Sequence, residues 1–200
     1  MMTESQPQRG GDRRLGVAIA LAAALALSGC AWGPADDNPA RAWLASVADP
    51  GCTAGGAVTH RQTPPMLYRA LASCIRAQHY QDGVLLFALA GSYSWYDALR
   101  VDSDEAREAH SLLLAETLKS VDKRRRQAFW MVAKATLADK QGHQAICQRI
   151  QAIGKPVYLP DYLSSFAAAG ALTRPMDDEA MWKAAIAGYM HCPTDVLVIR

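Results

Sequence analysis

Residues 64–78, PPMLYRALASCIRAQ, carry the pattern that decides the fold class. The apolar residues recur at spacings of three and four, at Leu67, Ala70, Leu71, Cys74 and Ile75. This spacing places their side chains on one face of an α-helix. The two prolines at the start suit the first turn of a helix. The stretch therefore predicts a helix over about 66–78 that buries one face.

Helical patterns separated by short loops fill the rest of the chain, and some begin at a good capping residue, such as Asn38 or Asp122. We expect further helices over about 39–48, 81–90, 103–120, 123–139, 143–153, 161–169 and 177–190. This set predicts an all-α protein, either a compact bundle or a short array of antiparallel helical hairpins. The length fits a single helical domain over 39–200, and apolar residues 196–199 predict an extended C-terminal tail.

The predicted helix over 81–90 is apolar on nearly every side, which favours a position at the centre of the protein. Gly91 is predicted to end it, so that residues 92–97, SYSWYD, form an aromatic connection. Tyr and Trp often carry the binding energy of protein interfaces. Tyr93, Trp95 and Tyr96 are therefore candidates for partner binding, and filling of the core is the competing explanation.

The two predicted helices between residues 67 and 95 resemble one tetratricopeptide unit. The matching residues are Leu67, Ala70, Leu71 and Cys74 in the first helix, and Tyr80, Gly83, Phe87 and Ala90 in the second. The chain departs from the motif where Gly83 replaces an alanine and Trp95 replaces the terminating proline. No second copy follows at the unit's period of about 34 residues. The resemblance implies a helical hairpin.

An uncharged run over 15–27 follows an arginine pair and ends in the tetrapeptide LSGC, Leu27-Ser28-Gly29-Cys30. The run is shorter than the about 20 residues that cross a bilayer, and it has the length of the apolar part of a secretory signal. The stretch resembles the signal of bacterial lipoproteins. That resemblance implies lipidation of Cys30.

By the same resemblance, residues 1–29 are a signal peptide that is removed, and residues 30–38 are a tether. Ala31 follows the lipidated cysteine, and in Gram-negative sorting a residue other than Asp there implies the outer membrane. The lipid is thus expected to hold the protein on a membrane, at the periplasmic face of the outer membrane. Several acyl chains, at about 0.8 kcal/mol per buried methylene, give stable anchoring.

Four cysteines remain after Cys30, namely Cys52, Cys74, Cys147 and Cys192. An even number in an exported protein predicts two disulfides, for which three pairings exist. We favour Cys52–Cys74 and Cys147–Cys192, because each would join a loop to a nearby helix. The cysteine spacing does not match a metal site, and no metal is expected.

The charge is nearly balanced, with 21 Lys and Arg against 19 Asp and Glu. A nucleic-acid-binding protein would show a basic face or stripe, so no nucleic-acid partner is expected. The densest charged run is Lys123, Arg124, Arg125 and Arg126. Positive charge at the start of a helix opposes the helix dipole. The run is a second candidate for binding an acidic partner or anionic head groups, with a solvated helix turn as the alternative.

Ser120 and Lys123 match the S-x-x-K nucleophile motif, but its companions S-D-N and K-T-G are missing. No nucleotide or cofactor motif occurs, so no catalytic residue and no cofactor is expected. The main hypothesis is a lipid-anchored periplasmic binding protein, either an immunity-type inhibitor of a toxin or an accessory of an envelope assembly. The alternative is an enzyme that acts on cell-wall or lipid substrate. Its candidate acid and base residues are Glu105, Glu108 and His110.

The lipid anchor predicts that Cys30→Ser moves the protein from the membrane fraction to the soluble fraction. Without the thiol, no acyl chain can be attached, and the tether loses its hold on the bilayer. Fractionation of cells that produce the full chain, followed by immunoblotting, measures the change. Retention of the Cys30→Ser variant in the membrane fraction would contradict the anchor.

Overall fold

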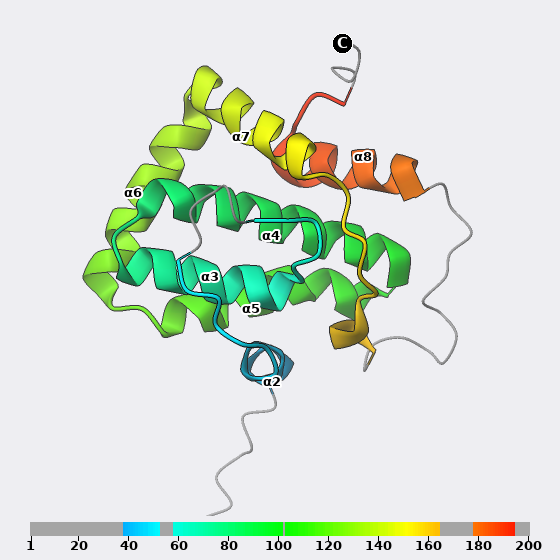
Figure 1. Cartoon of the computed structure of the whole chain (residues 1–200), viewed down its shortest axis with the longest axis horizontal. Helices are drawn as coiled ribbons and strands as arrows, with labels where there is room; N and C mark the ends of the chain where they lie inside the picture. The colour runs from blue at the N-terminus through cyan, green and yellow to red at the C-terminus, as the bar shows by residue number, and fades with distance from the viewer. Residues whose placement is uncertain (1–37, 53–57, 102, 165–177, 195–200) are drawn as a thin grey trace, which may run out of the picture. The chain divides into compact units, whose positions relative to one another are not determined.

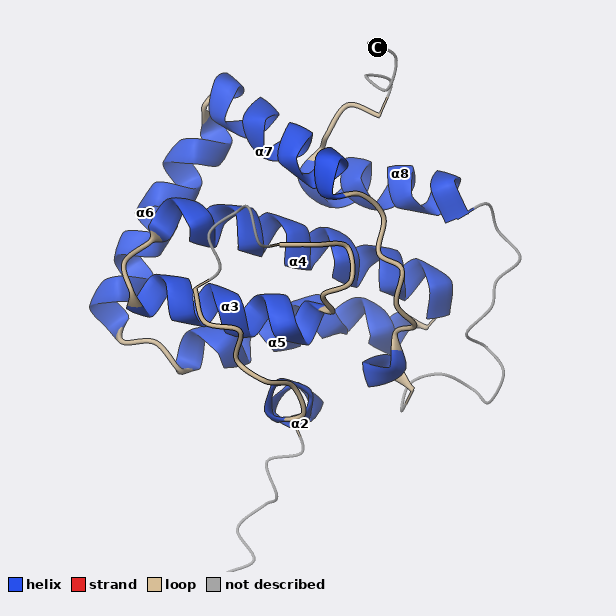
Figure 2. Cartoon of the chain, viewed as in Figure 1, coloured by secondary structure: helices blue, strands red, loops and turns tan. Residues whose placement is uncertain are grey.

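The computed structural model describes residues 38–52, 58–101, 103–164 and 178–194. Within these ranges the chain is all-helical and has no strand (Figure 2). The elements are α2 (Pro39–Ala45), α3 (Pro64–Arg76), α4 (Tyr80–Val101), α5 (Asp104–Lys119), α6 (Lys123–Ala138), α7 (Lys140–Ile153), the 3₁₀ helix η1 (Asp161–Leu163) and α8 (Asp178–Met190). The all-α prediction is thereby confirmed. None of the described helices is long and apolar enough to cross a membrane.

Several predictions fall on residues that the structure does not describe. These are the signal peptide, Cys30, most of the tether, and the C-terminal segment 196–199. The predicted helix over 161–169 is described only at its start, where η1 ends at Leu163.

Helix α4 is the element on which the others are assembled. Five helices pack against it, namely α3, α5, α6, α7 and α8 (Figure 1). Its buried residues lie on all sides of the helix, as expected for one that has no polar face. The prediction of a central helix was right, but the prediction that Gly91 ends it was wrong, because α4 is 22 residues long and ends only at Val101.

The contact at Gly91 explains why a glycine lies inside this helix. A Cβ atom added there would lie 2.1 Å from the ring of Tyr189, on α8. The tyrosine ring therefore occupies the space that any side chain at position 91 would need. Gly91 allows α8 to approach α4 closely, and this packing role replaces the predicted role as a helix stop.

Two disulfides join loops to helices. Cys52, in the loop after α2, pairs with Cys74 of α3, and Cys147 of α7 pairs with Cys192, just after α8. This is the pairing that we favoured from the sequence. Two disulfides indicate an oxidising, extracytoplasmic compartment.

Polar side chains set several helix ends. Asn38 accepts a hydrogen bond from the Ala40 amide at 3.1 Å, and Asp122 accepts one from Arg125 at 3.0 Å, as capping residues do. The helix predicted over 143–153 begins earlier, at Lys140, because Asp139 accepts a bond from the Gly142 amide at 2.7 Å and caps α7 there. Gly154 ends α7 with a φ of +87°.

Gly91→Ala is expected to lower the free energy of unfolding by about 1–3 kcal/mol. The added methyl group must displace the Tyr189 ring, and overpacking of this kind outweighs the about 1 kcal/mol by which alanine favours a helix over glycine. Gly83→Ala is the matched control in the same helix, because a Cβ added at Gly83 would lie 3.3 Å from its nearest neighbour, the Phe129 ring. Urea unfolding measures both variants, and equal stability of the two would contradict the interpretation.

Candidate functional site

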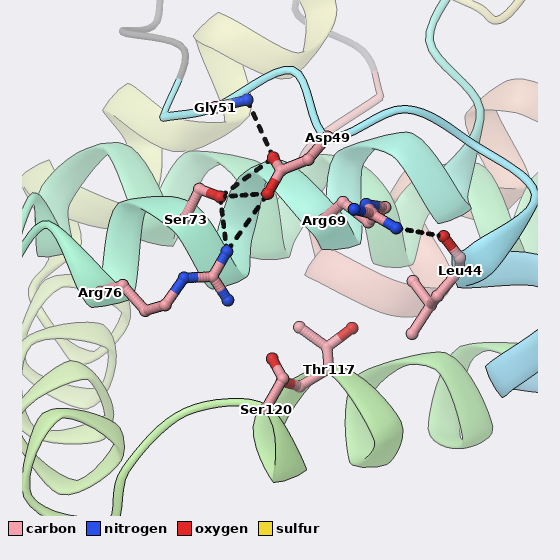
Figure 3. A network of polar contacts seen from close by, with 8 residues as sticks. All are labelled: Leu44, Asp49, Gly51, Arg69, Ser73, Arg76, Thr117 and Ser120. Carbon is pink, nitrogen blue, oxygen red and sulfur yellow. Dashed lines mark hydrogen bonds and ion pairs between the residues drawn. The ribbon is translucent and has the colours of Figure 1, made fainter.

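A pocket of roughly 280 Å³ lies between α2, α3 and α5. Its polar lining consists of Arg41, Asp49, Arg69, Arg76, Glu116, Thr117 and Ser120. Figure 3 shows the side chains of Arg69 and Arg76 on α3, with Thr117 and Ser120 on α5 across the gap. Three of these residues are arginines, which gives the pocket an excess of positive charge over its two carboxylates.

One end of the pocket is formed by the Asp49 carboxylate, which comes from the loop after α2. It accepts hydrogen bonds from the Ser73 hydroxyl at 2.8 and 3.0 Å and from the Gly51 amide at 2.9 Å. Arg76 forms an ion pair with it at 3.2 Å and also donates to the Ser73 hydroxyl (Figure 3). The charges of Asp49 and Arg76 therefore offset each other.

A second ion pair joins α2 to α5. The Arg41 Nε donates to the Glu116 carboxylate at 3.1 Å, and Lys119 pairs with the same carboxylate at 3.0 Å. Hydrogen bonds from these partners lower the pKa of Glu116, the bond from Lys119 being the largest cause. The carboxylate is thus ionised and already paired at neutral pH.

Arg69 differs from the other two arginines of the pocket. Its Nη1 donates to the main-chain oxygen of Leu44 at 2.8 Å, which fixes the guanidinium between α3 and α2 (Figure 3). No acidic side chain of the described residues pairs with it. Across the gap, the Thr117 hydroxyl is buried and has no hydrogen-bond partner among the described residues. These two polar groups are the unsatisfied part of the pocket.

The aromatic candidates do not lie in a loop, because all three belong to α4. Tyr93 and Tyr96 are completely or almost completely buried, and they pack edge-on against Trp182 of α8. Their prediction as partner-binding residues was therefore wrong. A continuous helix places residues three apart on the same face, and that face points toward α8.

Trp95 also packs against α8, beside Tyr189, but its side chain remains 42% exposed. Its ring covers Gly188 of α8, where an added Cβ would lie 2.9 Å from the ring. Trp95, Ala98, Leu99 and Arg107 line a small, mainly apolar pocket of roughly 140 Å³ between α4 and α5. Trp95 is thus the aromatic candidate that is still available for contact.

The basic run forms the exposed first turn of α6. Arg125 pairs with the helix cap Asp122 at 2.9 Å, and Arg126 donates to the main-chain oxygen of Leu118 at the end of α5, at 3.1 Å. Two of the four positive charges of the basic run are therefore already engaged, Arg125 by the helix cap and Arg126 by the end of α5. Lys123 and Arg124 are exposed, and binding of an anionic partner by this run stays a prediction.

Asp97 is a fully buried carboxylate on α4 that sequence reasoning did not single out. Arg100 forms an ion pair with it at 2.5 Å, and the hydroxyls of Tyr158 and Tyr162 both donate to it at 3.0 Å. Burial raises the pKa of Asp97 to about 6, against the lowering effect of Arg100. The network fastens the segment after α7 to α4.

His110 and Glu108 do not converge. His110 is hydrogen-bonded to the Tyr68 hydroxyl, and it lies beside the rings of Phe87 and Tyr189. Burial lowers the pKa of His110 to about 4, so the ring is neutral at pH 7. Glu108 is exposed, since two residues along a helix point to different sides. The side chain of Glu105 lies outside the described part.

Each disulfide has a histidine beside it. The Cys52 Sγ lies 3.7 Å from the Nδ1 of His79, and the Cys147 Sγ lies 3.8 Å from the Nε2 of His143. A metal ion would need thiolates, but these sulfurs are held in disulfide bonds. In the oxidised protein these groups are therefore structural pairs.

The arginine pocket was missed from sequence, although a signal for it existed. Arg69, Ser73 and Arg76 follow each other at spacings of four and three, which is a polar stripe along the predicted helix 66–78. The facing residue Thr117 carried no such signal, because only the packing of α3 on α5 brings it opposite.

Comparison of the chain with models of protein families, with curated proteins and with solved structures gave no significant match.

The raised pKa of Asp97 predicts a pH-dependent difference between the wild type and Asp97→Asn. In the native state the Asp97 carboxyl has a pKa of about 6, above the ordinary 3.8, so it binds a proton at a higher pH than in the unfolded chain. Its contribution to stability therefore grows as the pH falls from 7 to 4. The lowered pKa of His110 makes stability fall as the pH falls, but this effect is the same in the wild type and the variant, so it cancels in the difference. The free energy of unfolding of the wild type relative to the variant should rise by roughly 2 kcal/mol over this range.

Denaturant unfolding at several pH values measures this difference. At pH 7 the variant is also expected to be less stable, because Arg100 keeps its buried charge without a carboxylate. A difference that stays constant between pH 4 and pH 7 would show that Asp97 has an ordinary pKa.

Proposed function

We propose that this protein is a binding protein of the bacterial cell envelope, which contacts a protein partner through the surface around Trp95. The observation that carries the proposal is the exposed Trp95 ring at the edge of an apolar pocket of roughly 140 Å³. Binding pockets for small molecules have volumes of about 300–1,000 Å³. The Trp95 pocket is smaller, and it suits a single apolar side chain of a partner.

The residue types around the pocket support this proposal. Tryptophan and arginine are enriched among the residues that dominate interface energy, and Trp95 and Arg107 lie together here. Trp95 is also held in place by its packing over Gly188, so little conformational freedom is lost when a partner binds. Arg107 is exposed, and its charge favours a partner with an acidic group beside the apolar side chain.

The location follows from the disulfides and from the proposed lipid anchor. Two disulfides fit an extracytoplasmic compartment. Lipidation of Cys30 would hold the helical domain near the membrane, and Ala31 favours the periplasmic face of the outer membrane. The partner would then be a periplasmic or membrane protein that comes within reach of a short tether.

Two forms of such a binding protein fit this location. One is an immunity-type inhibitor that blocks a toxin in the periplasm, and the other is an accessory of an envelope assembly. An enzyme is the less favoured alternative, because Glu108 is exposed while His110 is enclosed by aromatic rings. A toxin-like gene beside the coding gene would favour the inhibitor.

Trp95→Ala and Arg107→Glu are each expected to weaken capture of the partner at least about tenfold, since truncation of a dominant interface residue costs 2 kcal/mol or more. The full tagged chain, produced in its host with its own signal, is crosslinked in cells and purified, and the captured protein is identified by mass spectrometry. Met131→Ala is the matched control, because Met131 is a 68% exposed apolar residue on α6.

The control should capture the partner as the wild type does. Equal capture by Trp95→Ala, Arg107→Glu and the wild type would contradict the proposed surface. Thermal unfolding of each variant shows whether a loss of capture comes from a loss of folding.

A further inference from the structure

We propose that the pocket between α2, α3 and α5 binds a phosphate group, which the Arg69 guanidinium and the Thr117 hydroxyl hold from opposite walls. This site is separate from the Trp95 surface, and its ligand is a small anion or an anionic head group.

The first support is the charge of Arg69. Both carboxylates of the pocket are already paired with cations, Asp49 with Arg76, and Glu116 with Arg41 and Lys119. Arg69 lines the same pocket, and its hydrogen bond within the described residues goes to the neutral Leu44 carbonyl. That bond leaves other guanidinium N–H groups for a ligand, and a half-buried positive charge favours an anion.

The second support is the Thr117 hydroxyl. Thr117 is 2% exposed, and its oxygen has no partner in the part of the chain that the structure describes. An unsatisfied buried hydroxyl costs about 1–3 kcal/mol, so it favours a ligand that brings an acceptor. The side chain points from α5 toward the wall that carries Arg69 (Figure 3).

Geometry favours phosphate over carboxylate. The donors lie on opposite walls, and a tetrahedral phosphate presents oxygens in several directions, whereas the two oxygens of a carboxylate point to one side. An arginine fork also matches two phosphate oxygens at once. The volume of roughly 280 Å³ exceeds what a bare phosphate ion fills, which leaves room for the group that carries it.

Asp49 shows that this pocket already accommodates an anionic group at one end. Its carboxylate takes donors from Ser73, Arg76 and the Gly51 amide, which is the kind of contact that an external anion would make. Asp49 lines the same pocket as Arg69, and its negative charge repels a second anion there. Removal of the Asp49 charge should therefore tighten phosphate binding.

The phosphate could belong to a membrane lipid or to a soluble molecule. Helix α2, which forms one wall, begins nine residues after Cys30, and nine extended residues reach at most about 30 Å. If Cys30 carries the lipid, head groups of the same membrane lie within that reach. The shared chemistry is the phosphate group, and the experiment separates the two sources.

The test is calorimetric titration of the full mature chain, purified from membranes in a phosphate-free sugar detergent. Inorganic phosphate is one probe, and soluble dihexanoylphosphatidic acid is the other. Binding of both shows that the phosphate group suffices, and binding of the lipid alone assigns the source to a head group. Absence of saturable binding by both probes overturns the proposal.

Four variants decide whether the binding occurs in this pocket. Arg69→Ala and Thr117→Val should each weaken binding roughly 10- to 100-fold, because a hydrogen bond to a charged ligand is lost. Asp49→Asn should tighten it. Arg149→Ala is the matched control, because it removes the same charge from the exposed side of α7 and should leave binding unchanged.

Thr117→Val keeps the test valid if Arg69→Ala unfolds, since Arg69 also holds α2 to α3. The valine variant removes an unpartnered hydroxyl, so its unfolding midpoint should equal or exceed that of the wild type. Binding that is unchanged in Thr117→Val, or weakened equally in Arg149→Ala, overturns the assignment to this pocket.

Discussion

Helix α4 is apolar on nearly every side, and the rest of the structure depends on this constraint. A helix without a polar face needs cover on most sides, and five helices pack against α4. Close approach of the last of these, α8, requires the glycine at position 91, because the Tyr189 ring occupies the space of a side chain there.

Burial of most of α4 also explains the unusual electrostatics of the core. Asp97 is enclosed with the helix, so it is paired with Arg100 and two tyrosines instead of water. His110 is enclosed by aromatic rings on the neighbouring helix α5. Burial raises the pKa of Asp97 and lowers that of His110, so their effects on acid stability oppose each other.

The two proposed binding sites lie where helices meet away from this core. The Trp95 pocket is formed along the exposed edge between α4 and α5, and the arginine pocket lies at the junction of α5 with α2 and α3. Beside the Trp95 pocket, Gly188 of α8 leaves room for the Trp95 ring, since a Cβ added there would lie 2.9 Å from the ring.

The all-α class, the central apolar helix and the caps at Asn38 and Asp122 were accessible from sequence, because each depends on spacing or on residues close in the chain. The favoured disulfide pairing was one of three possible, and only the fold decided it, because the paired cysteines lie 22 and 45 residues apart. The continuation of α4 through Gly91 was not accessible, because the reason for that glycine is a tyrosine about 100 residues later.

The same distinction separates the candidate sites. The sequence by itself identified Tyr93, Trp95 and Tyr96 as a group, but only tertiary packing decided that the two tyrosines are core and the tryptophan is surface. The sequence shows the polar stripe of Arg69, Ser73 and Arg76 through the spacing of these residues. It does not show that the stripe faces Thr117, because a pocket exists only when two helices bring their side chains to face each other across a gap.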